Sequence, residues 1–141
     1  MKQRDDYADI KVAVANSSTG GALVGTAINT TGYGRARFIF SFGGDVATTA
    51  TVSGNIGIWK CATSGGTYTS ISSAQLSQVS SGVVSDSTLA MVIDTPTDPD
   101  YVWLKVSGSI SSTAMCHSAV VELYNGVSLP PSSSLQELVT V

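Results

Sequence analysis

The sequence predicts an all-β protein: a single-domain antiparallel β-sandwich, jelly-roll-like, of about seven to nine strands. Apolar and polar residues alternate with a period of two along much of the 141-residue chain, and sustained helical periodicity is nearly absent. Glycine-rich turn signals separate most of the alternating segments. One domain accounts for this length, and we expect it to occupy residues 10–128 between an N-terminal arm, 1–9, and a C-terminal arm, 129–141.

At least seven strands can be assigned from this alternation. In Ala36–Phe42, Ala36 and the three phenylalanines share one face, which is typical of a half-buried strand that presents aromatic rings to a core. The stretch Gly57–Ile71 indicates a β-hairpin, because a turn of small residues separates two strand-like segments. The predicted strands are Ile10–Ala15, Val24–Asn29, Ala36–Phe42, Ile56–Cys61, Leu89–Asp94, Tyr101–Ser107 and Ser118–Tyr124.

Two connections between strands have distinctive compositions. Asp94–Asp100 contains two prolines, which interrupt strand pairing and predict a rigid corner before the next strand. Its three aspartates also suggest Ca²⁺, but the alternating ligands, glycine and terminal glutamate of an EF-hand loop are missing. Ser72–Ser87 is expected to be a long Ser-rich connection that lies on the domain and has room for one short helical turn.

Composition and charge argue against two classes of partner. The formal net charge is −3 and the pI is near 4.7, whereas a nucleic-acid-binding surface needs clustered Lys and Arg. No apolar run approaches the roughly 18 residues that would span a bilayer, and Met1–Tyr7 lacks the apolar core of a signal peptide. We therefore expect a protein made in the cytoplasm that binds neither nucleic acid nor membrane.

Residues suited to catalysis or cofactor binding are scarce. The one histidine, His117, adjoins Cys116, and neighbours in a strand point to opposite faces, so the two are unsuited to a thiolate–imidazole pair. Gly32–Gly34 lacks the lysine and the spacing of a phosphate loop, and zinc ligands and paired carboxylates are also missing. We expect no enzymatic activity, no cofactor and no metal. Cys61 and Cys116 are expected to be reduced thiols, with a disulfide left open.

Four aromatic residues allow two interpretations. Trp59, Tyr68, Tyr101 and Trp103 could line a platform that binds sugar rings, and Tyr101 and Trp103 alternate onto one strand face. The favoured interpretation is that the two tryptophans anchor the core, as large aromatic residues of sandwiches usually do.

Five segments follow one another between Gly32 and Pro131. They are Gly32–Gly34 before an aromatic strand, the hairpin Cys61–Thr69, the corner Asp94–Pro96, the strand Tyr101–Gly108 and the strand Ala119–Tyr124 before Pro130. In this order they resemble the small β-sandwich proteins of tailed-phage heads that act as capsid decoration, or cement, proteins. The resemblance implies a homo-oligomeric virion protein, a trimer or dimer, that binds the outer surface of the major capsid protein lattice and stabilises the mature head. The alternative is a tail or baseplate β-domain that binds carbohydrate or completes a tail ring.

Candidate contacts with the capsid or with another subunit come from both arms and from one strand. Met1–Tyr7 and Leu129–Val141 lie outside the predicted sandwich, where they can add a strand or an apolar contact to a neighbour; alternatively, the apolar end of the C-terminal arm folds back onto its own sheet. Arg35 and Arg37 share one strand face, which either contacts a partner's carboxylate or is solvated. The candidate residues are Arg4, Asp5, Asp6, Tyr7, Arg35, Arg37, Leu129, Pro130, Pro131, Leu135, Leu138 and Val139.

Overall fold

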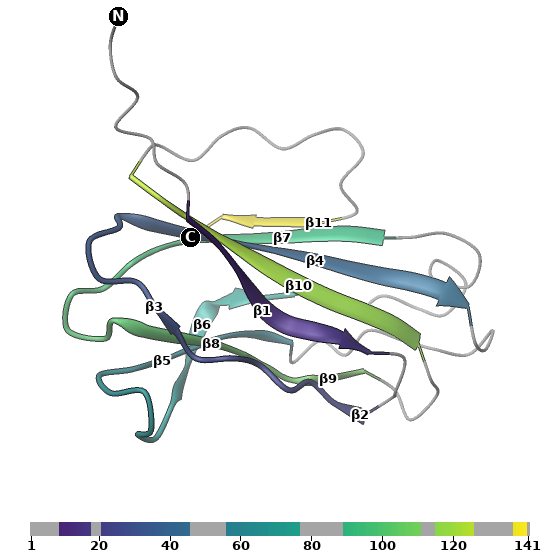
Figure 1. Ribbon diagram of the computed structural model, residues 1–141, viewed down its shortest axis with the longest axis horizontal. Helices are drawn as coiled ribbons and strands as arrows, with labels where there is room; N and C mark the ends of the chain where they lie inside the picture. The colour runs from purple at the N-terminus through teal and green to yellow at the C-terminus, as the bar shows by residue number, and fades with distance from the viewer. Residues whose placement is uncertain are drawn as a thin grey trace, which may run out of the picture.

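The computed structural model describes residues 9–17, 21–45, 56–76, 89–110, 115–125 and 137–140 of the chain. These ranges contain eleven β-strands and no helix (Figure 1). The strands are β1 (Asp9–Ser17), β2 (Gly21–Ala22), β3 (Ile28–Asn29), β4 (Arg35–Asp45), β5 (Gly57–Cys61), β6 (Thr69–Gln75), β7 (Leu89–Pro96), β8 (Trp103–Ser107), β9 (Ser109–Ile110), β10 (Met115–Tyr124) and β11 (Glu137–Thr140). Six of the seven predicted strands are found in the structure. Four lie inside β1, β4, β7 and β10, and two agree with β5 and β8 to within two residues.

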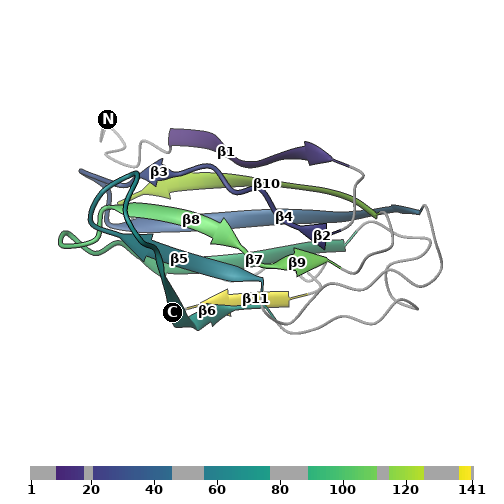
Figure 2. The same cartoon turned by 90° about the horizontal axis from the view of Figure 1, so that it is seen from below.

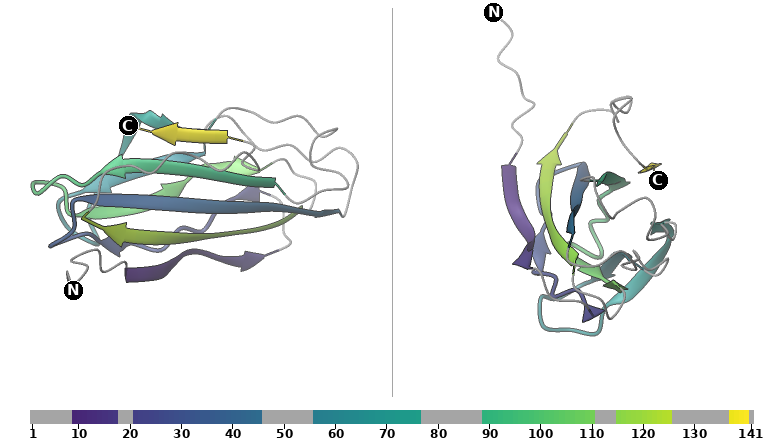
Figure 3. Two further views of the ribbon diagram at one scale, coloured as in Figure 1. Left: turned by 90° about the horizontal axis from the view of Figure 1, so that it is seen from above. Right: turned by 90° about the vertical axis from the view of Figure 1, so that its right-hand side faces the viewer.

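Two sheets pack face to face as a sandwich. The large sheet has five strands in the order β1, β10, β4, β7 and β11, which run side by side in the left view of Figure 3. The small sheet has four strands in the order β3, β8, β5 and β6, and it covers one face of the large sheet (Figure 2). A two-stranded sheet joins β2 to β9. The predicted all-β sandwich is confirmed, and its strands pair antiparallel except for the parallel pair β7 and β11.

One face of β4 supplies the centre of the core. Phe38 lies in register with Val121 of β10 and with Ile93 of β7, and all three side chains are fully buried. Phe40 and Phe42 continue this face, with their ring centroids 6.0 Å apart. The small sheet adds Ile58, Ala74, Leu104 and Val106. The predicted inward face of β4 is therefore confirmed, and the other face of the strand points away from the small sheet.

The predicted strand Val24–Asn29 is interrupted, and only its end forms β3. The residues before β3 change partner: the amide of Leu23 donates to the carbonyl of Gly108 at 2.9 Å, whereas the amide of Thr26 donates to that of Ala13 in β1 at 2.8 Å. A segment that crosses from one sheet to the other cannot keep the regular pairing of a single strand.

The prediction that Ser72–Ser87 is a connection is wrong for the first residues of this segment, which belong to strand β6. β6 continues to Gln75, pairs with β5 and buries Ala74 completely. β6 is the edge strand of the small sheet, so most of its hydroxyl side chains face solvent and few inward apolar residues are needed. The remainder of that segment, from residue 77, lies outside the described residues.

Gly25, in the crossing segment, lies against the backbone of β8. A Cβ atom added there would be 2.1 Å from the carbonyl oxygen of Val106, a backbone atom that cannot rotate away. We expect Gly25→Ala to lower the free energy of unfolding by about 1–3 kcal/mol, because the backbone must move to relieve this contact. Urea unfolding followed by circular dichroism measures the change. Gly65→Ala is the matched control, since an added Cβ meets nothing within 4 Å there; equal losses in both variants would contradict the explanation.

Candidate functional site

A charged cluster lies on the outer face of the large sheet, where β10, β4 and β7 are adjacent. Arg37 is in register with Asp94 of β7 and with Glu122 of β10. Nε of Arg35 donates to Oδ1 of Asp94 at 2.9 Å, and Nη2 of Arg37 donates to Oδ2 at 3.0 Å. The hydroxyl of Tyr124 also donates to Oδ2. We refer to Arg35, Arg37, Asp94 and Tyr124 as the Asp94 cluster.

Burial and hydrogen bonding act in opposite directions on the carboxyl of Asp94, which has no exposed surface. Burial raises the pKa of Asp94, but the hydrogen bonds from Tyr124, Arg35 and Arg37 lower it by more, so the pKa lies below its ordinary value. Burial and the bond to Asp94 raise the pKa of Tyr124. The guanidinium carbon of Arg37 lies 5.1 Å from the centre of the Tyr124 ring, a cation–π contact that also holds the cluster together.

The two arginines that were predicted to contact a partner are therefore used inside the chain. Their side chains are 18% and 16% exposed, and each bonds to Asp94. The alternative of a solvated strand face is wrong, because the buried carboxylate of Asp94, 57 residues beyond Arg37, lies on the same face in the neighbouring strand and accepts from both arginines. A partner's carboxylate would have to compete with Asp94 for the same donors.

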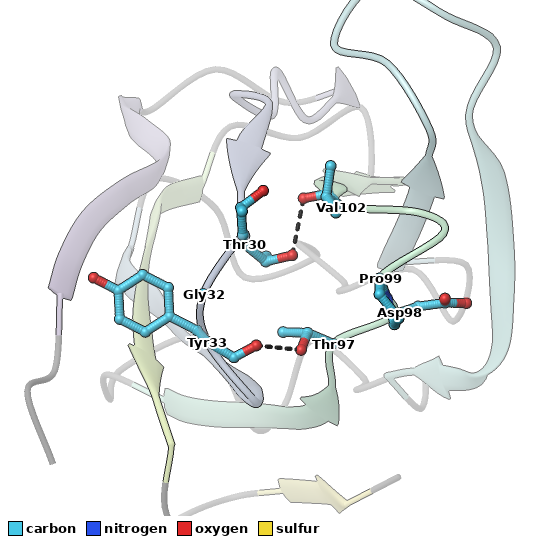
Figure 4. Close-up of a pocket in the computed structure, with 8 residues that line it drawn as sticks. Thr30, Gly32, Tyr33, Thr97, Asp98, Pro99 and Val102 are labelled. Atoms are coloured by element: carbon cyan, nitrogen blue, oxygen red, sulfur yellow. Dashed lines mark hydrogen bonds between the residues drawn. The ribbon is translucent and has the colours of Figure 1, made fainter. Parts of the chain in front are cut away.

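A hollow opens at one end of the sandwich, between the turn before β4 and the corner before β8. Its volume is about 290 Å³, and its walls include Thr30, Tyr33, Thr97 and Val102 (Figure 4). The hydroxyl of Thr30 donates to the carbonyl of Val102 at 2.9 Å, and the hydroxyl of Thr97 donates to that of Tyr33 (Figure 4). Both threonine donors are satisfied within the chain, which favours a structural role for this end of the sandwich.

The corner before β8 also holds its aspartates by internal contacts. Asp98 accepts a hydrogen bond from the amide of Asp100 at 3.0 Å, and its carboxylate lies 3.1 Å from Nζ of Lys60. The hydrogen bond from the amide has the larger effect and the contact with Lys60 the smaller, and both lower the pKa of Asp98. Nζ of Lys60 also lies 4.3 Å from the centre of the Tyr101 ring, so Tyr101 belongs to the corner and not to the strand face predicted for it. In the ranges that the structure describes, no three His, Cys, Asp or Glu side chains form a metal-binding group.

The two tryptophans lie on the outer face of the small sheet. Ile58 and Val106 are in register and fully buried, so their neighbours Trp59 and Lys105, also in register, face outward. Trp103 shares this outward face of β8 with Lys105. Both indole rings are half-buried. The interpretation that the tryptophans anchor the core is therefore wrong, because aliphatic neighbours in the same strands occupy the inward positions.

A cation and a phenol border these rings. Nζ of Lys105 lies 5.6 Å from the centre of the ring of Tyr68, which comes from the hairpin between β5 and β6. Nε1 of Trp59 is buried and has no hydrogen-bond partner in the part of the chain that is described, so packing holds this ring. We refer to Trp59, Tyr68, Trp103 and Lys105 as the aromatic face.

The cysteines and the histidine do not form a reactive pair. Cys61 and Cys116 are both free thiols, as predicted. His117 is buried on the core side of β10, in register with Phe42, and the alternation of the strand turns its neighbour Cys116 to the other side.

Only part of the predicted arms lies within the described residues. Asp9, assigned to the N-terminal arm, is the first residue of β1. Leu138 and Val139 belong to β11, whose parallel pairing with β7 places them opposite Val92 and Ile93. The backbone of this segment thus follows the alternative in which the C-terminal arm returns to its own sheet. The candidate contacts outside the described residues are Arg4, Asp5, Asp6, Tyr7, Leu129, Pro130, Pro131 and Leu135.

Comparisons with protein-family models, with curated proteins and with solved structures find no match to this chain. The fold alone therefore defines its class, an all-β sandwich domain. Over the described ranges, no helix is long and apolar enough to cross a membrane. Within the described ranges, the aromatic face and the outer side and edges of the large sheet are candidate surfaces for a function.

Proposed function

We propose that this chain is a non-catalytic structural protein of a tailed-phage virion that binds the outer surface of the major capsid lattice and stabilises the mature head. The observation that carries the proposal is the aromatic face. Tryptophan and tyrosine supply much of the binding energy at protein interfaces. Trp59 and Trp103 lie outside a core that phenylalanine and aliphatic residues already fill, so folding does not require them there.

The sandwich suits this role as a rigid platform. Strands β5 and β8 fix both tryptophans on a hydrogen-bonded sheet, so little conformational entropy is lost when a partner covers them. A protein that binds the expanded lattice more tightly than the precursor lattice stabilises the expanded form by mass action. Several linked copies that bind together would increase the overall affinity further.

Co-sedimentation with heads of the phage that encodes this chain tests the proposal, using mature and precursor heads stripped of the protein. We expect saturable binding that prefers mature heads. The double replacement Trp59→Ser and Trp103→Ser should weaken it at least 30-fold, which corresponds to about 2 kcal/mol for interface tryptophans. Val24→Ser, at an 82% exposed valine that is not part of the aromatic face, is the matched control. Equal binding by the double variant and the control, with both folded, would overturn the assignment of this surface.

The same surface supports one competing function, a tail or baseplate domain that binds carbohydrate. Flat, partly exposed indole rings beside a lysine can stack on sugar rings as well as on protein. Titration with host surface glycans, followed by tryptophan fluorescence, distinguishes the two functions. Saturable quenching together with no binding to either kind of head would favour the carbohydrate-binding domain.

A further inference from the structure

β1 is an open edge of the large sheet over its first four residues. It pairs on one side with β10, and no other strand of the described ranges lies beside it in the sheet, as the left view of Figure 3 shows. At Ala13 and Val14 the free side is covered, because the Ala13 carbonyl accepts the amide of Thr26 and Val14 forms a bridge to Gly25. Asp9–Val12 is the part of the edge that pairs with no other strand in the part of the chain that the structure describes.

This open edge carries an exposed apolar patch. Ile10 is 67% exposed and Val12 is 57% exposed, and their spacing of two puts both on the outer face of the sheet. Val12 is in register with Val120 of β10, which is 37% exposed. Unpaired backbone groups beside exposed β-branched side chains form a surface suited to adding another strand.

The charges of β1 show which strand fits. Asp9 and Lys11 flank Ile10, carry opposite charges and lie on the side of the sheet opposite to Ile10. Their side chains are 42% and 39% exposed, with Nζ and Oδ2 at 3.2 Å from each other. Charges at an edge usually discourage pairing. Here, however, the pattern acid, apolar, base becomes complementary to itself when it is read in the antiparallel direction.

We propose that the β1 edges of two copies of this chain pair antiparallel about a two-fold axis at Ile10, which joins the two large sheets into one. Ile10 then lies opposite Ile10 of the second copy, and Asp9 lies opposite Lys11 in both directions. A two-fold axis at Asp9 or at Lys11 would instead oppose two like charges, which is unfavourable. With an axis between Ile10 and Lys11, Ile10 would lie opposite Lys11 of the second copy. The outer face of one sheet would then continue into the core-facing side of the other sheet.

The pairing has two structural consequences. The valines Val12 and Val120 of each copy are brought to a shared outer surface, so the apolar patch is partly removed from water in both copies. The register shift in β1 between Val12 and Val14 ends regular pairing there, which limits the contact to a short segment. A two-fold contact of this kind closes at the dimer. It leaves the aromatic face free and does not depend on what that face binds.

Sedimentation velocity of the full chain over a range of concentrations tests this pairing. We expect a concentration-dependent dimer. Asp9→Lys and Lys11→Asp should each weaken association at least 10-fold, because every pair at the edge then opposes like charges, whereas the double variant with both exchanges should restore it. Ile10→Arg should also give monomers, and Ser73→Arg, at an exposed site on β6 of the small sheet, should not.

Three results would overturn the pairing: a wild-type monomer at all concentrations, charge variants that associate like the wild type, or a double variant that stays as weak as the single ones. A closed trimer would also exclude it, because a two-fold contact cannot generate three-fold symmetry. Circular dichroism of every variant shows that the sandwich is folded. The head-binding assay with the tryptophan variants is separate, so failure of the dimer and failure of the proposed function can be told apart.

Discussion

Asp94→Ala is expected to lower the free energy of unfolding by about 3 kcal/mol at neutral pH, since removing one partner of a buried ion pair leaves the others uncompensated. Asp94 is fully buried, and it accepts hydrogen bonds from Arg35, Arg37 and Tyr124. Without the carboxylate, two guanidinium groups and a phenol would lose the buried acceptor that they share. Urea denaturation at pH 7 measures the loss.

A second ion pair provides the control for Asp94. Lys60 and Asp98 lie 3.1 Å apart, but their side chains are 30% and 37% exposed. Solvent screens such a pair, so Asp98→Ala should change the free energy of unfolding much less than Asp94→Ala does. If both alanine variants lost the same stability, burial of the Asp94 cluster would not be the cause.

The same cluster predicts a pH dependence with a definite sign. The folded-state pKa of Asp94 lies below its unfolded value of about 3.9. Its contribution to stability is therefore complete above that value and is lost as the pH falls through the folded pKa. We expect the difference in unfolding free energy between wild type and Asp94→Asn to be largest near neutral pH and to shrink below about pH 4. A difference that stayed constant from pH 7 to pH 3 would contradict this.

The sequence was sufficient to predict the layers of the fold, but not which side chains of neighbouring strands contact each other. The inward face of β4 follows from alternation alone, because three phenylalanines occur at every second position. The contact between Arg37 and Asp94 depends on which strands are neighbours, and β4 and β7 are 57 residues apart at this pair. A signal was nevertheless present, since Asp94 ends an apolar run in which a buried charge needs a partner.

The tryptophans show where a general preference outweighed a local pattern. In β8 the residues Trp103 and Lys105 alternate with Leu104, so the shared face of a lysine and a tryptophan already indicated the outside of the sheet. The usual burial of tryptophan in sandwich cores favoured the opposite interpretation. β11 carried a weaker signal: a strand of four residues that pairs in parallel is too short for its alternation to indicate a partner.

Phe38→Ala is expected to cost about 3–5 kcal/mol of unfolding free energy, because a large cavity would open where the two sheets meet. Phe38 is fully buried between Val121 and Ile93, which are themselves fixed by the pairing of β10 and β7 with β4. Strands on both sides restrain the surrounding residues, so the site can collapse only partially. Thermal and urea unfolding of the variant measure the loss.

Its neighbour Ile39 provides a control within the same strand. Ile39 is half-buried on the outer face, in register with Val120 and Val92. Truncation there removes side-chain contacts at a surface that water can reach, so Ile39→Ala should cost only about 1 kcal/mol. The contrast between adjacent positions tests the register directly, since a shift of one residue would exchange the two faces. Equal costs for the two variants, or a larger cost for Ile39→Ala, would contradict the assignment of the Phe38 face of β4 to the core.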